Sequence, residues 1–349
     1  MPRHSLRYTV VSVVTAVTSV GVLLSPGAAA GDGAAQRSCF PSQSLRSIAG
    51  EEIVKKGDHT FDGRAPTDTS TTASTVPAHL RGAIRRVTLP PGKKLIALTF
   101  DLCEQQGEVA GYDGAIFDYL RDQNVQATLF VGGKWMRSHA ARTEQLMLDP
   151  LFEIASHSDT HHNARIIDAA TLHREIAGPQ ATYEARRAEI ASRQCSGQGD
   201  GSTVAPAPRI ALFRFPFGAC NQQSLDAVND AGLLAIQWDV STGDPAKGQT
   251  AAAIANAMTH KTRPGSILIS HANGRGWHTA AALPLAIPKL KAMGYTFVTV
   301  SELLAAGKPV VEQACYNDKP GDTDKYDTLF SLATKPKSDA LPIPGATTP

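Results

Sequence analysis

The sequence has no large excess of charge of either sign. Its 349 residues include 34 Lys and Arg against 32 Asp and Glu, which gives a formal net charge of +2. Proteins that bind nucleic acid through its phosphates carry a clear excess of basic residues. The composition therefore gives no support to a nucleic-acid partner, and none is expected.

Long apolar runs are absent beyond the first 30 residues. Residues 1–30 have Arg3 and Arg7 near their start, an apolar run from Tyr8 to Leu24 and small residues at their end. This pattern predicts a secretory signal peptide, and an uncleaved N-terminal anchor is the alternative. Removal of two arginines and no acid leaves a net charge of 2 − 2 = 0. We expect a secreted or periplasmic protein that has no membrane contact after cleavage.

Cysteines are few. The chain has five: Cys39, Cys103, Cys195, Cys220 and Cys315. Export would place them in an oxidising compartment, where cysteines tend to pair. Because their number is odd, at least one must be a free thiol or form a bridge to another molecule.

Short apolar runs alternate with amphipathic stretches through the middle of the chain. The apolar runs predict strands at Leu95–Phe100, Gln126–Val131, Phe152–Ser156, Ile210–Phe213, Leu234–Val240, Ser266–Ser270 and Thr296–Val300. The stretches between them predict helices near Gly114–Gln123, Ser138–Leu148, Ala169–Ala177, Ser224–Ala231, Thr250–Met258 and Ala280–Met293. Repeated strand and helix predict a parallel α/β fold. Because the strands are nearly all apolar, and so buried on both faces, we predict a closed or nearly closed barrel.

The ends of this domain are marked by the loss of the alternating apolar pattern. Residues 31–92 are irregular and predict an N-terminal extension, the main domain covers 93–306, and 307–349 predict a poorly ordered tail. Within the domain, Gly178-Pro179 predicts a break in the helix that begins near Ala169.

Two histidines, His157 and His161, follow the apolar run Phe152–Ser156. Neutral imidazole is a common ligand of divalent metals. In a helical turn, a spacing of four places both rings on one side, where one ion can contact them. A pair of surface or hydrogen-bonded histidines is the alternative.

Polar side chains end five of the seven predicted strands. They are Asp101, His157, Arg214, Asp239 with the nearby Asp244, and His271. In parallel α/β barrels the carboxyl ends of the strands form the active-site face. We therefore expect these side chains to meet at one mouth and form a hydrolytic metal site. Taken singly, each could be a turn cap, an ion-pair partner of a structural carboxylate or a buried, hydrogen-bonded histidine.

The motifs Thr99-Phe100-Asp101, His157-Ser-Asp-Thr-His161, Arg214-Phe-Pro-Phe-Gly218 and Ser270-His271, in this order, resemble those of the polysaccharide deacetylase family. The resemblance covers about Lys93 to Leu304. That family includes chitin-oligosaccharide and peptidoglycan N-acetylglucosamine deacetylases and some acetyl-xylan esterases. The resemblance implies a distorted seven-stranded (β/α) barrel, in agreement with the strands predicted above.

The resemblance also implies metal-assisted amide hydrolysis. His157 and His161 match the histidines that hold a divalent ion, most commonly zinc, with cobalt as another option. Asp101 matches the base and His271 the acid that protonates the leaving amine. Arg214 matches the residue that keeps the base carboxylate charged.

Three further residues are expected to contact the substrate. Phe217 and Gly218 belong to the turn that follows Arg214, and Trp277 lies in a glycine-containing loop where its ring could stack on a sugar. An ordinary loop aromatic is the alternative for Trp277. The substrate would be an N-acetylated polysaccharide or oligosaccharide.

The chain departs from the family's motifs at Leu102. The family has a second aspartate there, which is its third metal ligand. Glu104 and Asp113 are candidate replacements, Asp101 itself could ligate, and Asp113 could instead be a helix N-cap. Ser241 also stands where the family commonly has an aspartate, so Asp239 or Asp244 is the expected partner that orients Arg214.

Two cysteines are expected at the mouth of the barrel. Cys103 follows Asp101 by two residues, and Cys220 follows the Arg214 turn. We predict a disulfide between Cys103 and Cys220 that braces the two loops. A reactive or ligating thiol, and a bridge between Cys195 and Cys220, are the alternatives.

The predicted function is an exported, metal-dependent hydrolase that removes acetyl groups from N-acetylated glycans. The alternatives are a catalytically impaired glycan-binding protein on the same fold and a deacetylase of O-acetyl esters. Loss of the aspartate at Leu102 favours impairment. Retention of Asp101, Arg214 and His271 favours an enzyme. The particular glycan and the oligomeric state are left open by the sequence.

Overall fold

The computed structural model describes residues 39–63, 75–193 and 206–328. The predicted signal peptide, Cys195 and the last part of the chain lie outside the described residues. Within the described ranges, no helix combines the length and the apolar character needed to cross a bilayer.

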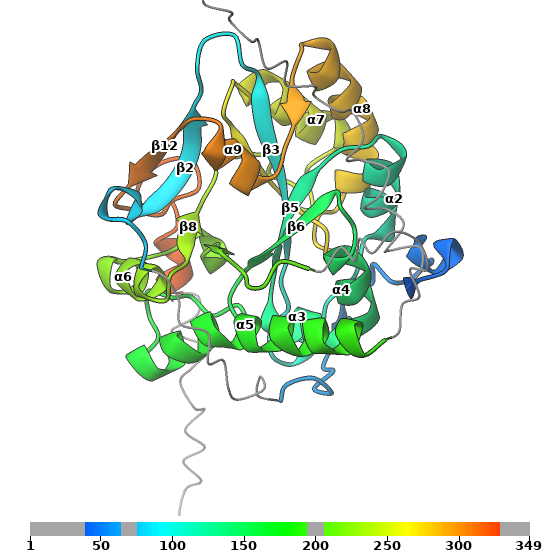
Figure 1. The fold of residues 1–349 in the computed structure, drawn as a ribbon, viewed down its shortest axis with the longest axis vertical. Helices are drawn as coiled ribbons and strands as arrows, with labels where there is room; N and C mark the ends of the chain where they lie inside the picture. The colour runs from blue at the N-terminus through cyan, green and yellow to red at the C-terminus, as the bar shows by residue number, and fades with distance from the viewer. Residues whose placement is uncertain (1–38, 64–74, 194–205, 329–349) are drawn as a thin grey trace, which may run out of the picture.

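A curled and mostly parallel sheet forms the centre of the molecule (Figure 1). Its strand order is β12-β2-β8-β7-β6-β5-β3-β10-β9, and β11 pairs with the start of β3. Only the pairing of β12 with β2 is antiparallel among the described strands of this sheet. The strands are β2 (Ala83–Thr88), β3 (Leu95–Leu102), β5 (Ala127–Val131), β6 (Phe152–Ser156), β7 (Leu212–Phe213), β8 (Leu234–Ile236), β9 (Val240–Ser241), β10 (Ile267–His271), β11 (Thr296–Phe297) and β12 (Lys308–Glu312). The fold is the expected distorted (β/α) barrel.

The fifth predicted strand, Leu234–Val240, is divided in two and closes the barrel. Its first part is β8, which pairs with β7 and β2, whereas its end is β9, which pairs with β10. The strands predicted from the sequence follow one another in the sheet as β8-β7-β6-β5-β3-β10-β9, so β8 and β9 are the two ends of this row. One short segment therefore connects both ends of the row.

Helices surround the sheet on its outer side (Figure 1). They are α2 (Gly114–Asp122), α3 (Gly133–Ser138), α4 (Ala140–Met147), α5 (Ala169–Ser192), α6 (Gln222–Asp230), α7 (Ala251–Lys261), α8 (Thr279–Ala292) and α9 (Val300–Ala305). Short 3-10 turns occur at η1 (Ser42–Leu45), η2 (Ala78–Leu80) and η3 (Pro216–Gly218). The break predicted at Gly178-Pro179 is wrong, because α5 continues through both residues. A Cβ at Gly178 would lie 2.6 Å from Cγ of Asp159, so this glycine permits a close approach to the helix.

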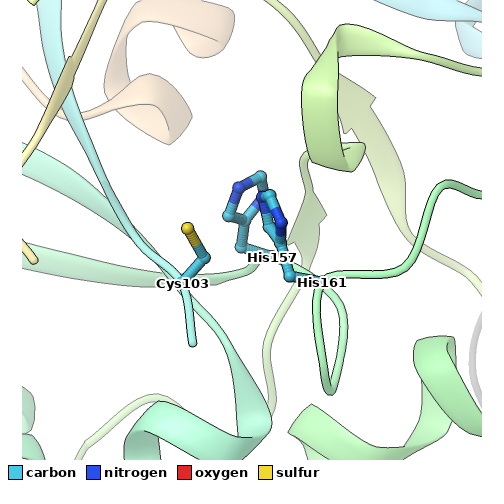
Figure 2. Close-up of side chains that lie close together, drawn as sticks. All are labelled: Cys103, His157 and His161. Carbon is cyan, nitrogen blue, oxygen red and sulfur yellow. The ribbon is translucent and has the colours of Figure 1, made fainter. Parts of the chain in front are cut away.

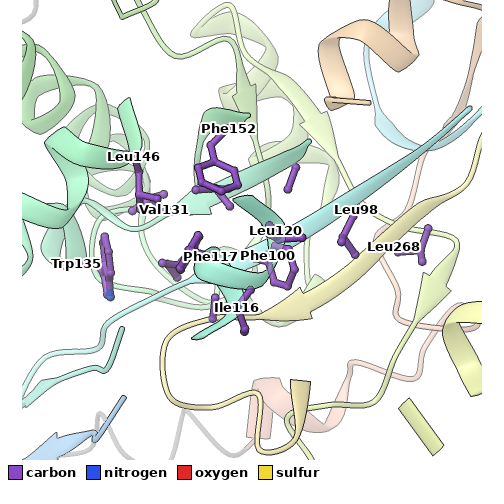
Figure 3. Packing of buried hydrophobic residues seen from close by; sticks show 14 of the residues in the cluster. Leu98, Phe100, Ile116, Phe117, Leu120, Val131, Trp135, Leu146, Phe152 and Leu268 are labelled. Atoms are coloured by element: carbon purple, nitrogen blue, oxygen red, sulfur yellow. The ribbon is translucent and has the colours of Figure 1, made fainter. Parts of the chain in front are cut away.

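Side chains along β3 alternate between two apolar clusters. Leu98, Phe100 and Leu102 belong to the cluster between sheet and helices, part of which Figure 3 shows around Phe117. Ala97 belongs to a second cluster, with Ile269 of β10, on the other face of the sheet. Successive side chains of a strand point to opposite faces, so Asp101 shares the face of Ala97. On this face of β3, Asp101 lies near the carboxyl end of the strand, at the mouth of the barrel.

The two terminal segments are more ordered than predicted. In the region predicted as irregular, β1 (Lys55–Lys56) pairs with β4 (Glu108–Val109), and β2 joins the main sheet. The prediction of a poorly ordered tail from residue 307 is wrong for its first part, because β12 pairs with β2. We call the described residues after β12, 313–328, the C-terminal strap. Buried Arg85 of β2 holds this strap by donating to the carbonyls of Tyr316 and Asn317 at 2.7 and 2.8 Å.

Candidate active site

The carboxyl ends of β3, β6 and β10 open into one cleft of about 640 Å³. Asp101, His157, His161 and His271 line it. Arg214, which directly follows β7, is fully buried below them. The structure thus brings together the polar residues that end four of the predicted strands.

Arg214 fixes the carboxylate of Asp101. Its Nη1 donates to Asp101 Oδ1 at 2.7 Å and to Thr99 Oγ1 at 2.8 Å. Burial alone would raise the pKa of Asp101, but the charge of Arg214 outweighs burial and holds the pKa below its usual range. Asp101 is therefore charged at neutral pH, with Oδ2 on the side of His157 Nε2, 3.4 Å away.

His271 lies beside Asp101 because these residues are opposite each other in the parallel register of β10 and β3. Its Nδ1 is 2.9 Å from Oδ1 of Asp244, and its backbone N–H donates to Oδ2 at 2.6 Å. Burial alone would lower the pKa of His271, but the charge and hydrogen bond of Asp244 outweigh it and raise the pKa. With Nδ1 directed at Asp244, Nε2 is the ring nitrogen left for a substrate.

The prediction that Asp239 or Asp244 orients Arg214 is wrong. Asp239 accepts from Arg263 at 3.2 Å and from the backbone N–H of Ile267 at 2.9 Å. Asp244 serves His271 instead. Among the described residues, Asp101 is the carboxylate that contacts Arg214.

His157 and His161 meet through a loop, so the helical turn expected from their spacing is wrong. His157 directly follows β6, and the residues up to His161 are not helical. Ser158 and His161 have φ angles of 62° and 61°, and Ser158 Oγ accepts the backbone N–H of His161 at 3.0 Å. This tight loop turns the two rings toward each other, with centroids 5.0 Å apart.

Both histidines are neutral at neutral pH. His157 Nδ1 is 2.9 Å from the carbonyl oxygen of Arg214, which can only accept, so Nδ1 carries the proton and Nε2 a lone pair. Burial lowers the pKa of His157 below its usual range and that of His161 well below it. The neutral form is the one that binds metal ions.

Cys103 lies next to these histidines (Figure 2). Its Sγ and one ring nitrogen of each histidine lie within 4.8 Å of one another. The predicted Cys103–Cys220 disulfide is wrong, because Cys103 is a free buried thiol and Cys220 is bonded to Cys315. Burial raises the pKa of Cys103 to about 12. Cys39 is also disulfide-bonded.

Two of the three carboxylates considered as the third ligand, Glu104 and Asp113, lie outside the cluster formed by the two histidines and Cys103. Glu104 accepts from Ser138 Oγ at 2.7 Å and from the backbone N–H of Ala110 at 3.0 Å, and burial raises its pKa to about 7. Asp113 occupies the N-cap position of α2, and burial, helped by Glu52, raises its pKa to about 6. The cluster of metal-ligating side chains in the described part of the chain contains neither of them.

The donors in this cluster fit a divalent transition-metal ion. Two neutral imidazoles supply nitrogen, and a neighbouring cysteine supplies sulfur, all within 4.8 Å of one another. Nitrogen and sulfur donors suit zinc and cobalt better than magnesium or calcium, which prefer oxygen. The residues present are therefore compatible with the metal expected from the sequence.

Two of the three predicted substrate contacts line the cleft. Phe217 and Gly218 do so, and the ring of Phe217 packs edge-on against His161 with centroids 4.4 Å apart. Phe217 has a φ angle of 61°, a left-handed conformation that directs its ring into the cleft. Trp277 is absent from the lining, and Lys247 Nζ lies 4.9 Å from the centre of its ring.

The C-terminal strap forms another wall of the cleft. The ring of Tyr326 lies 5.2 Å from that of Phe217, and Cys315 is bonded to Cys220. Arg165 holds the far end of the strap through ion pairs with Asp324 and Asp327. The lining residues of the strap are Asn317, Asp318, Lys319, Asp322, Thr323, Lys325 and Tyr326.

Sequence reasoning missed this wall and the role of Asp244. The strap lacks apolar periodicity, and its only signal was Cys315, a cysteine far along the chain in an otherwise polar stretch. The sequence shows Asp244 as an acid beyond a strand end, but nothing in its spacing distinguishes a partner of His271 from a partner of Arg214. Asn273, which contacts Cys103, also went unnoticed.

Known proteins share sequence and fold with this chain. Residues 88–236 match the sequence profile of a family described as polysaccharide deacetylase. The chain is 26% identical over 226 residues to a chitooligosaccharide deacetylase of Azorhizobium caulinodans, covering 61% of this chain and 95% of the relative. It is 27% identical over 219 residues to a peptidoglycan-N-acetylglucosamine deacetylase of Bacillus cereus, covering 62% and 91%.

Another relative is much longer than this chain. It is a bifunctional xylanase/deacetylase of Pseudobutyrivibrio xylanivorans, 28% identical over 214 residues, which cover 60% of this chain and 30% of the relative. The chain thus spans less than a third of that protein.

Two solved structures share the fold. A CE4 family pseudoenzyme from Bacillus anthracis superposes with a TM-score of 0.53 at 23% identity, covering 65% of this chain and 70% of that one. A family 4 acetyl xylan esterase from Clostridium thermocellum, solved with a cobalt ion, has a TM-score of 0.50 at 26% identity, covering 65% and 100%. Sequence profile and fold thus both relate the matched region, residues 88–236, to the polysaccharide deacetylase family.

Proposed function

We propose that the protein removes acetyl groups from N-acetylated glycans by metal-assisted hydrolysis, giving acetate and a free amino sugar. One observation carries the proposal. A carboxylate held charged by Arg214 and a histidine held by Asp244 face the same cleft from adjacent strands, beside His157 and His161. Hydrolysis of an amide needs a base and an acid in such reach of one bond.

Asp101 is the base. Arg214 occupies Oδ1, which leaves Oδ2 to take a proton from the attacking water. Because Arg214 also lowers the pKa of Asp101, the carboxylate is ready to accept a proton over a wide pH range. The oxygen of the water then adds to the acetyl carbon.

His271 is the acid. Its Nε2 donates a proton to the sugar nitrogen as the bond between carbon and nitrogen breaks. Asp244 raises the pKa of His271 and so increases the protonated fraction near neutral pH. After the reaction Asp101 holds one proton more and His271 one proton less, so exchange with solvent restores both.

His157 and His161 would hold the metal ion, with zinc as the preferred ion and cobalt as an alternative. When bound, a divalent ion supplies Lewis-acid polarisation of the acetyl carbonyl. The histidines are suited to this because both are neutral and Nε2 of His157 carries a lone pair. The Arg214 carbonyl fixes the ring of His157 from behind, as second contacts of metal ligands commonly do.

The substrate class follows from the relatives and the cleft. A chitooligosaccharide deacetylase and a peptidoglycan-N-acetylglucosamine deacetylase align to this chain over 95% and 91% of their own lengths. The signal-peptide pattern and the Cys220–Cys315 disulfide support a secreted or periplasmic location, where such glycans occur. Nucleic acid remains without support as a partner.

Acetate release tests the proposal. The full chain would be incubated with chitooligosaccharides, peptidoglycan and acetyl-xylan, with Asp101→Asn as the matched inactive control. We expect acetate from an N-acetylated glycan, loss of activity with a chelator and recovery with Zn²⁺ or Co²⁺. Acetate from acetyl-xylan alone would make the protein an ester deacetylase. Glycan binding without acetate from any substrate would make it a binding protein.

A further inference from the structure

The position that carries a metal-binding aspartate in the family is turned away from the cleft in this chain. Leu102 is fully buried in the apolar cluster between sheet and helices. Side chains alternate along β3, so the next residue toward the mouth after Asp101 is Cys103. Figure 2 shows its sulfur on the side of the two imidazole rings.

We propose that Cys103, as a thiolate, is the third protein ligand of the metal ion and that Asn273 positions its sulfur. On binding, the S–H bond of Cys103 breaks, its proton goes to solvent, and a bond forms between sulfur and metal. The inference deepens the proposed function and rests on it for the presence of an ion. It assigns the ligand that Leu102 cannot supply.

The first argument is the composition of the cluster. One donor atom from each of Cys103, His157 and His161 lies within 4.8 Å of the other two. Cys103 and His157 are 5% and 2% exposed, so their donors are shielded from water. A catalytic zinc site usually has three protein ligands and one open position, and this cluster offers three buried or half-buried donors of the right kind.

The second argument is the hydrogen bond that the sulfur accepts. Asn273 Nδ2 is 3.2 Å from Sγ of Cys103 and 2.7 Å from its carbonyl oxygen. Asn273 is itself fully buried, at 0% exposure. An amide N–H aimed at sulfur stabilises a thiolate more than a thiol, and such contacts orient metal ligands. Two bonds from one amide fix both the backbone and the side chain of Cys103.

The third argument is that the nearby carboxylates of the described residues have other partners. The side chain of Glu104 is turned toward Ser138 and the backbone of Ala110. Asp101 is engaged by Arg214 and serves the proposed reaction as the base. Cys103 therefore supplies the remaining donor of the cluster that the described residues form.

A thiolate in this place changes which ions the site prefers. One sulfur and two imidazoles favour Zn²⁺ and Co²⁺ over Mg²⁺, Ca²⁺ and Mn²⁺, which prefer oxygen. We therefore expect a large excess of Mg²⁺ to leave bound Zn²⁺ in place.

Cobalt spectroscopy tests the assignment without substrate. Bonding of thiolate to Co²⁺ produces an intense near-ultraviolet charge-transfer band, which oxygen and nitrogen ligands do not give. We expect this band in the full chain loaded with Co²⁺ and its absence in Cys103→Asp and Cys103→Ala. Cys103→Asp should keep most of the metal affinity, whereas Cys103→Ala should lose at least about 10-fold to 100-fold. Co²⁺ bound by the wild-type chain without this band would overturn the proposal.

Two neighbouring substitutions serve as controls. Glu104→Gln, next in the chain, should keep both the band and the affinity. Asn273→Ala should weaken metal binding by about tenfold and shift the band, because the sulfur loses its amide donor. Loss of metal in Glu104→Gln with no loss in Cys103→Ala would assign the third ligand to Glu104 instead.

A measurement on the wild-type chain covers the case of variants that fail to fold. Iodoacetamide labelling at Cys103 would be followed by peptide mass spectrometry, with and without Zn²⁺. We expect Zn²⁺ to protect Cys103, and equal labelling in both conditions would count against the proposal. The band and the protection are read without a glycan, so a protein that shows both but releases no acetate would refute the proposed function and leave the ligand assignment standing.

Discussion

Asp101 and His271 lie opposite each other in the register of two adjacent parallel strands, β3 and β10. Each has its own fixed partner, Arg214 for the carboxylate and Asp244 for the imidazole. The partners act in opposite directions on the two protons, since Arg214 lowers the pKa of Asp101 and Asp244 raises that of His271. The pair thus has a charged base and an acid whose protonated fraction is increased.

Replacement of the base tests the first half of this pair. In Asp101→Asn the amide cannot accept the proton of the attacking water, so kcat should fall by about 10²-fold to 10⁴-fold. Metal content should stay that of the wild type, because the proposed ligands are untouched. Initial rates of acetate release and metal analysis of the purified variant check both points. A variant with near wild-type kcat would remove Asp101 from the base role.

Asp244→Asn tests the second half through the pH profile. Burial lowers the pKa of His271 and Asp244 raises it, so removal of the charge lets the pKa fall. The acid form is then lost at lower pH, and the alkaline limb of kcat/KM should move to lower pH. Asp239→Asn is the matched control, because Asp239 bonds Arg263 and the backbone of Ile267. An alkaline limb that shifts equally in both variants would contradict the assignment.

Glu104→Gln should change the pH dependence of stability. Burial raises the pKa of Glu104 from 4.5 to about 7, so the folded state resists ionisation that the unfolded state allows. Stability from the protonated form is complete below the unfolded pKa and is lost as pH rises toward the folded pKa. The free energy of unfolding of the variant, relative to the wild type, should therefore increase between about pH 5 and about pH 8. Denaturant titrations at the two pH values measure it, and an unchanged difference would show that Glu104 ionises normally.

Removal of the Cys220–Cys315 disulfide should loosen the C-terminal strap. The double variant Cys220→Ser/Cys315→Ser is expected to lose about 2–5 kcal/mol of unfolding free energy. Because the strap lines the cleft, KM for the glycan should rise more than kcat falls. Neither cysteine of this disulfide is a proposed metal ligand, so the metal content of the variant should not change. Kinetics and thermal unfolding of the variant test this, and an unaltered KM would separate the strap from substrate binding.

Much of the barrel was predictable because buried parallel strands are apolar along their whole length. Every predicted strand exists at least in part, and the polar residues at four of the strand ends come together at one cleft, whereas Asp239 does not. β2 was not predicted, because Arg85 and Arg86 interrupt its apolar pattern. Arg85 is nevertheless buried, since carbonyls of the strap satisfy its guanidinium. The carbonyl of Tyr316, one of these two acceptors, is 231 residues away from Arg85 in the sequence, so no local pattern could indicate it.

The chemistry of the site was less predictable than its residues. The spacing of His157 and His161 indicated that one metal ion could contact both. It did not indicate the loop that joins them, which depends on left-handed φ angles at Ser158 and His161. The partner of Asp244 depends on where β9 crosses the barrel, a long-range property. Which of the five cysteines form a pair is likewise set by the fold, because neither Cys220 nor Cys315 has a local sequence feature that indicates its partner.

Closure of the barrel by the segment from β8 to β9 has a practical consequence for any shortened form of the protein. The region matched by the family profile ends at residue 236, before β9 and β10. A fragment cut there would lose the neighbour of β3 on the β10 side and expose its N–H and C=O groups as an unprotected edge. Such an edge invites pairing with other chains, so this fragment should aggregate rather than fold. The unit to express extends through the C-terminal strap.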